Sequence, residues 1–276
     1  MRTRIVVGVL LALLFLLTLF FGGVVQCVMF SLATSICVYE MVKTFQKKGL
    51  NPFSYPLYLF ALIYYPVTRY TPAIYWLLLL LVFCVTATIV ERIFNKKRTT
   101  EDVFASLSVF LYPLSFFVFI AAIHKLSGEP LSRIALLMMF AGPLLGDTMA
   151  YFIGVFRGRH KLCPHISPKK TVEGSIGGLA GGIMGGILVY FVQQYFDIRP
   201  YVGIIPMMVL GLLCGAMGQI GDLFASTIKR WADIKDFGTF LPGHGGMLDR
   251  LDSVLMCAPM VFLFFYAVHS YVTGLL

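Results

Sequence analysis

One stretch of the chain places an acid, a hydroxyl and an amine at helical spacing. Asp222, Ser226 and Lys229 are four and then three residues apart, so a helix presents all three on one face. An acid inside an apolar segment is energetically unfavourable and is usually functional. We therefore expect this face to line a cavity, with Lys229 at its mouth beside Arg230. A carboxylate there can hold a metal ion, and the amine can neutralise a phosphate.

The segment that follows, residues 229–250, combines acids, bases and glycines. Paired carboxylates hold Mg²⁺, and successive glycine amides can form a nest for an anion. Together these features predict a phosphate ester bound with a metal at the membrane surface. Taken singly, a glycine-rich turn is more often only a turn, and a lone histidine is more often a hydrogen-bonded spacer. The residues concerned are Lys235, Asp236, Gly243, His244, Gly245, Gly246, Asp249, Arg250 and, just beyond, Asp252.

A second polar segment precedes an apolar run. Lys169 and Lys170 lie immediately before a predicted helix that starts near Thr171, and helix N-termini bind anions. These lysines are candidates for binding a phosphate, although setting the membrane topology would also explain their charge. Two further acids fall within apolar runs. Asp147 is a candidate site residue or a structural partner, whereas Glu40 is more simply explained as an interfacial residue paired with Lys43.

The elements that position these residues are membrane helices. The chain has 276 residues, of which 59% are hydrophobic and 13% are charged. A soluble domain has roughly 25% charged residues, and a helix needs about 20 apolar residues to span a bilayer. We therefore predict an all-α polytopic membrane protein and exclude a soluble domain with one anchor. The sequence indicates about nine spans, near residues 4–21, 24–45, 54–68, 72–90, 103–124, 131–156, 172–194, 201–229 and 251–273.

The distribution of positive charge predicts the orientation of these spans. With nine spans, the basic residues outside the cytoplasm are only Arg69, Lys125, Arg133 and Arg199, out of 22 lysines and arginines. This asymmetry obeys the positive-inside rule. The N-terminus is then cytoplasmic, as are loops 157–171 and 229–250. A net charge of +9 borne by loops between apolar runs indicates anionic lipid or nucleotide and excludes a nucleic-acid partner.

The chain divides by function into two parts. We expect 1–130 to be an N-terminal transmembrane part and 131–276 to be the catalytic transmembrane region. In the span 172–194, glycines recur every four residues in two adjacent rows, which lets another helix approach closely. Packing within the bundle is the simpler interpretation of these rows, and a dimer seam is the alternative.

The polar segments resemble the signature of a known family. Residues 226–230, 235–236 and 241–252 are similar to the phosphatidate cytidylyltransferase pattern S-x-x-K-R, K-D and P-G-H-G-G-x-x-D-R-x-D, with every gap preserved. Upstream, 147–151 and 167–178 are similar to a second block, D-x-x-A-Y and SPKKT-x-E-G-x-x-G-G. Val155 departs from the block, because many members have an arginine there. The resemblance covers about residues 140–273 well, while the first half matches only in apolar character and in Glu40.

The resemblance implies a reaction and a set of site residues. CTP and phosphatidic acid would give CDP-diacylglycerol and pyrophosphate with Mg²⁺, at a bacterial inner membrane and in a homodimer. It assigns the metal, with room for a second cation, to Asp222 and Asp249. The catalytic residues it implies are Asp222, Asp249, Lys229, Arg230 and Arg250. Those it implies for substrate binding are Asp147, Ser167, Lys169, Lys170, Thr171, Glu173, Ser226, Lys235, Asp236, His244, Gly245, Gly246 and Asp252.

Two other functions fit parts of the pattern. A CTP-dependent polyprenol or lipid kinase is the nearest alternative, and the full signature argues against it. An anion transporter would also need intramembrane acids, but the sequence has no recognisable inverted repeat. We expect an in-line displacement at the α-phosphorus of CTP by an anionic phosphate oxygen, which hardly needs a general base.

Overall fold

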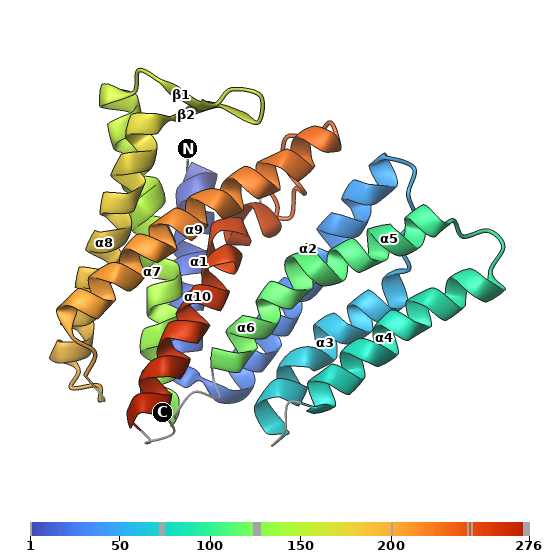
Figure 1. Ribbon diagram of the computed structural model, residues 1–276, viewed down its shortest axis with the longest axis horizontal. Helices are drawn as coiled ribbons and strands as arrows, with labels where there is room; N and C mark the ends of the chain where they lie inside the picture. Colours follow the sequence, from blue (N-terminus) through green and yellow to red (C-terminus); the bar gives the residue numbers. More distant parts are fainter. Residues whose placement is uncertain are drawn as a thin grey trace. The chain divides into compact units, whose positions relative to one another are not determined.

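The computed structural model describes residues 2–71, 75–123, 128–199, 201–241, 243 and 245–272. Its elements are helical except for one short hairpin (Figure 1). The helices are α1 (Arg2–Phe21), α2 (Gly23–Lys47), α3 (Ser54–Tyr70), α4 (Tyr75–Phe94), α5 (Thr100–Val109), the π-helical turn η1 (Phe110–Leu114), α6 (Ser115–Ile123), α7 (Gly128–Arg157), α8 (Val172–Tyr195), α9 (Ile204–Trp231) and α10 (Leu248–Val272). The strands are β1 (Lys161–Cys163) and β2 (Ser167–Thr171).

Apolar length confirms a multi-pass membrane protein but not the predicted number of spans. Within the described residues, 7 helical segments are long and apolar enough to cross a membrane. The third predicted span is the helix α3, which has only 17 residues. The apolar part of the first, Gly8–Phe21, is shorter still. Both segments are helical as expected, but the count of nine is not confirmed, because a bilayer-spanning helix needs about 20 residues.

The chain forms two compact units, and the division falls within three helices, α6, α9 and α10. The first unit comprises residues 1–122 and 231–250, and the second comprises 123–230 and 251–276. In the first unit, α2, α3, α4 and α5 pack together. Aromatic side chains fill its core: Phe30 stacks on Tyr65, Phe60 stacks on Tyr64, and the Tyr64 hydroxyl lies 2.9 Å from Thr34 Oγ1.

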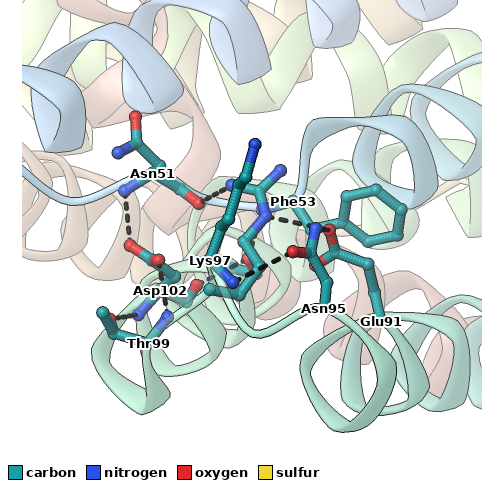
Figure 2. Close-up of polar contacts among 9 residues, drawn as sticks. Asn51, Phe53, Glu91, Asn95, Lys97, Thr99 and Asp102 are labelled. Carbon is teal, nitrogen blue, oxygen red and sulfur yellow. Dashed lines mark hydrogen bonds and ion pairs between the residues drawn. The ribbon is translucent and has the colours of Figure 1, made fainter.

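A polar cluster in the first unit joins the loop after α2 to the loop after α4 (Figure 2). The Asp102 carboxylate accepts hydrogen bonds from the amides of Asn51, at 2.5 Å, and Thr99, at 2.9 Å. Thr99 in turn caps α5 through its hydroxyl. Arg98 bridges the cluster by donating to the Asn51 carbonyl at 2.5 Å and to Glu91 Oε1 at 2.9 Å. These contacts fix both loops and account for Asp102, a buried acid, as a structural residue.

In the second unit, the glycine rows of α8 are used for packing within the unit. One row faces α7, where a Cβ on Gly185 would lie 2.9 Å from the Cα of Gly142. The other row faces α9, where a Cβ on Gly182 would meet the Gly211 carbonyl oxygen and lie 2.9 Å from the Cα of Gly215. The absence of side chains therefore permits backbone-to-backbone packing of three helices, which confirms the simpler interpretation of the pattern.

The predicted loop 157–171 contains an antiparallel hairpin that the sequence analysis did not anticipate. Lys161 pairs with Thr171 and Cys163 pairs with Ser167. Thr171 ends β2 and caps α8, because its hydroxyl accepts a hydrogen bond from the Gly174 amide at 3.1 Å. The hairpin thereby holds the two lysines of β2 directly before the start of α8.

Candidate functional site

A cavity of about 350 Å³ lies within the second unit. Its walls come from α7, the hairpin, α8 and α9. Five residues singled out from the sequence line it, so the structure brings together predicted side chains from three separate elements, α7, β2 and α9. The lining residues are Asp147, Ala150, Tyr151, Gly154, Val155, Leu162, Lys169, Lys170, Thr171, Gly174, Ser175, Gln219 and Asp222.

The acid and the amine in this α7–α9 cavity form an ion pair. Lys170 Nζ of β2 contacts Asp222 Oδ2 of α9. The Lys170 side chain is 25% exposed and that of Asp222 is 32% exposed, although the Lys170 Nζ atom itself is buried. An ion pair that is only half-buried can exchange its partners for a metal ion and an anionic substrate. The other walls are largely apolar, which suits a ligand with both an anionic and an apolar part.

The face of α9 on the C-terminal side of Asp222 is polar and buried, as the spacing of Asp222, Ser226 and Lys229 predicted. Ser226 and Lys229 are each 8% exposed, although they lie in an apolar helix. Asp252 of α10, 5% exposed, interacts electrostatically with Asp222, Lys229 and Asp147. Three carboxylates and one ammonium group of the second unit are therefore close enough for their charges to interact.

Ser253 of α10 donates hydrogen bonds to both Asp147 and Asp252. The Ser253 amide donates to Asp252 Oδ1 at 2.7 Å, and its hydroxyl donates to Asp147 Oδ2 at 3.5 Å. The helices α9 and α10 also approach closely here, since a Cβ on Gly221 would meet the carbonyl oxygen of Asp252. The structure thus connects Asp147 of the upstream block to Asp252, the last acid of the signature.

Other predicted residues of the second unit form hydrogen bonds with its backbone. Glu173 accepts hydrogen bonds from the amides of Arg159, at 3.0 Å, and His160, at 3.2 Å, and its Oε1 pairs with His160 Nδ1 at 2.6 Å. It is absent from the residues described as lining the cavity. Arg230 is exposed and donates to the Ile166 carbonyl at 3.3 Å, and Ser167 begins β2. These contacts hold the hairpin and the start of α8 in place.

The α9–α10 loop, residues 232–247, belongs to the first unit and is folded around Asp249. Asp249 Oδ2 accepts the amide hydrogens of Phe237, at 2.8 Å, and Gly246, at 2.9 Å. A bridge between Leu241 and Gly245 closes the turn, and Gly245 has a φ of 86°, which disfavours any residue with a side chain. The Gly246 amide is therefore occupied by the protein's own carboxylate, which corrects its expected role in an anion nest.

Glu40 has a contact that the sequence did not predict. Its Oε1 accepts the Met247 amide and its Oε2 accepts the Leu248 amide, each at 2.8 Å. The side chain is 1% exposed, so Glu40 is a buried anchor and not an interfacial partner of Lys43, which lies over the Tyr39 ring. The nearest sequence signal was the acid itself in an apolar helix. Its partners are more than 200 positions away, so spacing could not reveal them.

The remaining predicted residues of the loop point to solvent or lie outside the description. Lys235, Asp236 and Arg250 are exposed, and Gly243 has a φ of 79°. His244 lies outside the described residues. The motif residues described in the first unit are thus an anchored Asp249 flanked by exposed charges.

The acids fit a divalent cation by their chemistry. Asp222 is half-buried at the cavity wall and pairs with the Lys170 side chain, while Asp249 accepts two backbone amides through its Oδ2. Mg²⁺ prefers such carboxylate oxygens and keeps substrate phosphates in its shell. Among the described residues, no three acid, histidine or cysteine side chains are already gathered as a metal cage. Such a site would take its remaining ligands from substrate and water.

Comparisons with known proteins extend the similarity over the whole chain. A family model described as "Cytidylyltransferase family" matches residues 2–268. A phosphatidate cytidylyltransferase of Bacillus subtilis is 32% identical, over 95% of this chain and 96% of the relative. A protein of the same name from Aquifex aeolicus is 34% identical over 61% of this chain and 59% of its own. One from Staphylococcus saprophyticus is 39% identical over 46% of each chain.

Proposed function

Because this chain belongs to the cytidylyltransferase family, we propose that it is a membrane enzyme that transfers a cytidylyl group from CTP to phosphatidic acid. The products are CDP-diacylglycerol and pyrophosphate. The observation that carries this function is the Lys170–Asp222 pair on the wall of the largely apolar α7–α9 cavity. Such a wall provides an amine for phosphate and an acid for a metal ion.

The chemistry is an in-line displacement. A phosphate oxygen of phosphatidic acid attacks the α-phosphorus of CTP, a new P–O bond forms, and the bond to the β-phosphate oxygen breaks as pyrophosphate leaves. The attacking oxygen is already anionic, so the protein's task is to position two phosphates that repel each other. Lys169 and Lys170 bind substrate phosphate, while Lys229, Arg230 and Arg250 offset the remaining negative charge.

The motif positions assign Mg²⁺ to Asp222 and Asp249. When bound, Mg²⁺ supplies positive charge at the α-phosphate and at the pyrophosphate that leaves. Within this proposal, the other motif residues named above for substrate binding, from Asp147 to Asp252, contribute to binding the two substrates, except Gly246, whose amide binds Asp249. Two of them, Ser167 and Glu173, act by holding the hairpin that carries the lysines.

The location follows from the charge distribution. We place the enzyme in a bacterial inner membrane with its polar loops in the cytoplasm, since CTP is a cytoplasmic nucleotide and basic residues gather in those loops. Phosphatidic acid then enters from the bilayer with its acyl chains remaining in lipid. A homodimer is part of the proposal on the family resemblance alone, because the glycine rows are used within the second unit.

Isotope transfer tests the reaction. Purified protein receives phosphatidic acid, Mg²⁺ and CTP labelled at either the α- or the γ-phosphate. We expect the α label in lipid and the γ label in pyrophosphate. Polyprenol is the second acceptor, and lipid labelled only from the γ position would establish a kinase and overturn the proposal. For an Asp222→Asn variant in the same assay, Asp197→Asn is the matched control. Asp197 also pairs with a cation in the second unit, but it is exposed and lies outside the motif.

A further inference from the structure

Glu40 is the one buried acid of α2, a helix to which the signature assigns no role. It lies about two turns before the end of α2 at Lys47 and is 1% exposed. A buried carboxylate needs strong hydrogen-bond partners, because leaving it without them is expensive. Its two oxygens accept the amides of Met247 and Leu248, each at 2.8 Å. The charge is thus placed at the amino-terminal end of α10, where the helix dipole favours an anion.

The loop is shaped to admit this carboxylate. A Cβ on Gly246 would lie 2.5 Å from Glu40 Oε1, and one on Gly238 would lie 2.6 Å from the same oxygen. Both positions therefore require glycine while Glu40 is in place. The glycines of the loop have a second use besides turning the chain, since two of them make room for an acid from a distant helix.

Two carboxylates accept hydrogen bonds from adjacent parts of the same backbone. Glu40 holds the amides of residues 247 and 248, while Asp249 holds those of Phe237 and Gly246. The three successive amides from 246 to 248 are all donated to these acids. Releasing Glu40 would therefore loosen the backbone that directly precedes Asp249 and Arg250.

We propose that Glu40 is a positioning residue that fixes the backbone of residues 246–248 and, through it, the Asp249 side chain. The proposal rests on the function proposed above in giving Asp249 and Arg250 their task. Glu40 itself contacts neither substrate nor metal in this role. It acts on the reaction only through the loop that it holds, so its loss leaves the residues of the α7–α9 cavity unchanged.

Hydrogen exchange tests the contact without requiring turnover. The full chain in detergent, with neither CTP nor Mg²⁺, is compared with Glu40→Gln, in which the amide group would turn an N–H donor toward one of the two backbone donors. We expect the amides of 246–248 to exchange roughly 10- to 100-fold faster, as loss of a charge-assisted bond predicts. Glu40→Asp keeps the charge with a shorter reach, and its exchange should be intermediate.

Asp102→Asn is the matched control. Asp102 is also a buried acid of the first unit that accepts two backbone amides, but its partners are Asn51 and Thr99. This variant should speed exchange near those partners and leave 246–248 as in the wild type. Unchanged exchange of 246–248 in Glu40→Gln, or equal acceleration there in Asp102→Asn, would overturn the proposal.

Kinetics separate positioning from general destabilisation. At matched thermal stability, we expect Glu40→Gln to need several-fold more Mg²⁺ for its half-maximal rate than Asp102→Asn, because Asp249 is no longer held. If the wild type is active and Glu40→Gln needs no more Mg²⁺ than the control, Glu40 does not position Asp249, and the proposed function still stands. A wild type without cytidylyl transfer would defeat the proposed function, while the exchange result still decides whether Glu40 holds the loop.

Discussion

The acids that bind the α9–α10 loop and those that line the α7–α9 cavity have different kinds of partner. Glu40 and Asp249 accept hydrogen bonds from backbone amides, whereas Asp222 is paired with the side chain of Lys170. Backbone amides cannot change partner without a change in the fold, but a lysine side chain can turn toward a phosphate. An acid in an apolar segment is therefore a candidate for substrate chemistry when its partners are exchangeable side chains, and for positioning when its partners are backbone amides.

Asp222→Asn is expected to have the largest effect on activity and little effect on folding. The change keeps the size of the side chain and removes the charge that would hold Mg²⁺. We expect the transfer of α label into lipid to fall by roughly 1,000-fold or more, as for loss of a metal or oxyanion contact. The melting temperature in detergent should stay near that of the wild type. Near-normal transfer would mean that this acid has no role in the reaction.

Asp249→Asn should also abolish transfer, but it should loosen the loop as well. An amide oxygen at this position retains weaker bonds to Phe237 and Gly246, and the charge-assisted part is lost. The expected loss of local stability is about 1.5–3 kcal/mol. Hydrogen exchange of residues 237 and 246 measures it, with Asp222→Asn as the comparison. If both variants gave the same exchange pattern, the distinction between the two regions would fail.

Sequence patterns located the helices and the cavity residues because both depend on local spacing. The predicted span 172–194 is α8, Val172–Tyr195, and the spacing of Asp222, Ser226 and Lys229 placed Ser226 and Lys229 on a buried face of α9. α10 begins at Leu248, three residues earlier than predicted, and its first amide is bound by Glu40 of α2. No local pattern contains that contact.

Short polar segments were the other limit on prediction. Five of the predicted site residues line the cavity, whereas Glu173, to which the resemblance gives a role in substrate binding, holds the backbone before the hairpin. The hairpin itself pairs residues such as Cys163 and Ser167, which have no alternating apolar pattern to indicate strands. Its register depends on where α7 and α8 place its two ends, and this is a tertiary constraint.

Gly182→Ala tests whether the cavity region depends on close helix packing in a way that the loop does not. The added methyl group would overlap the Gly211 carbonyl and lie 2.9 Å from the Gly215 Cα, both of them backbone atoms that cannot turn away. Overpacking of this kind is worth roughly 1–3 kcal/mol, which exceeds the gain of up to about 1 kcal/mol in helix propensity. We expect a lower melting temperature.

Gly203→Ala is the control for this substitution, because its nearest neighbour would be Pro206 Cδ at an ordinary 3.6 Å. It should melt like the wild type. Exchange of the 246–248 amides should be unaffected in both variants. A Gly182→Ala protein as stable as Gly203→Ala would show that α8 and α9 can separate without loss, and the glycine rows would then need another explanation.

Lys48→Met should have the smallest effect, although it removes an ion pair from the same loop that Glu40 holds. Lys48 Nζ lies 2.5 Å from Asp233 Oδ2, but the Asp233 side chain is 82% exposed. Water and salt screen such a pair, so its loss should change stability by less than about 1 kcal/mol. Amide exchange at 246–248 should match the wild type. Loosening as large as that in Glu40→Gln would mean that surface charge holds the loop, and the contrast between backbone-bound and exchangeable acids would no longer explain its order.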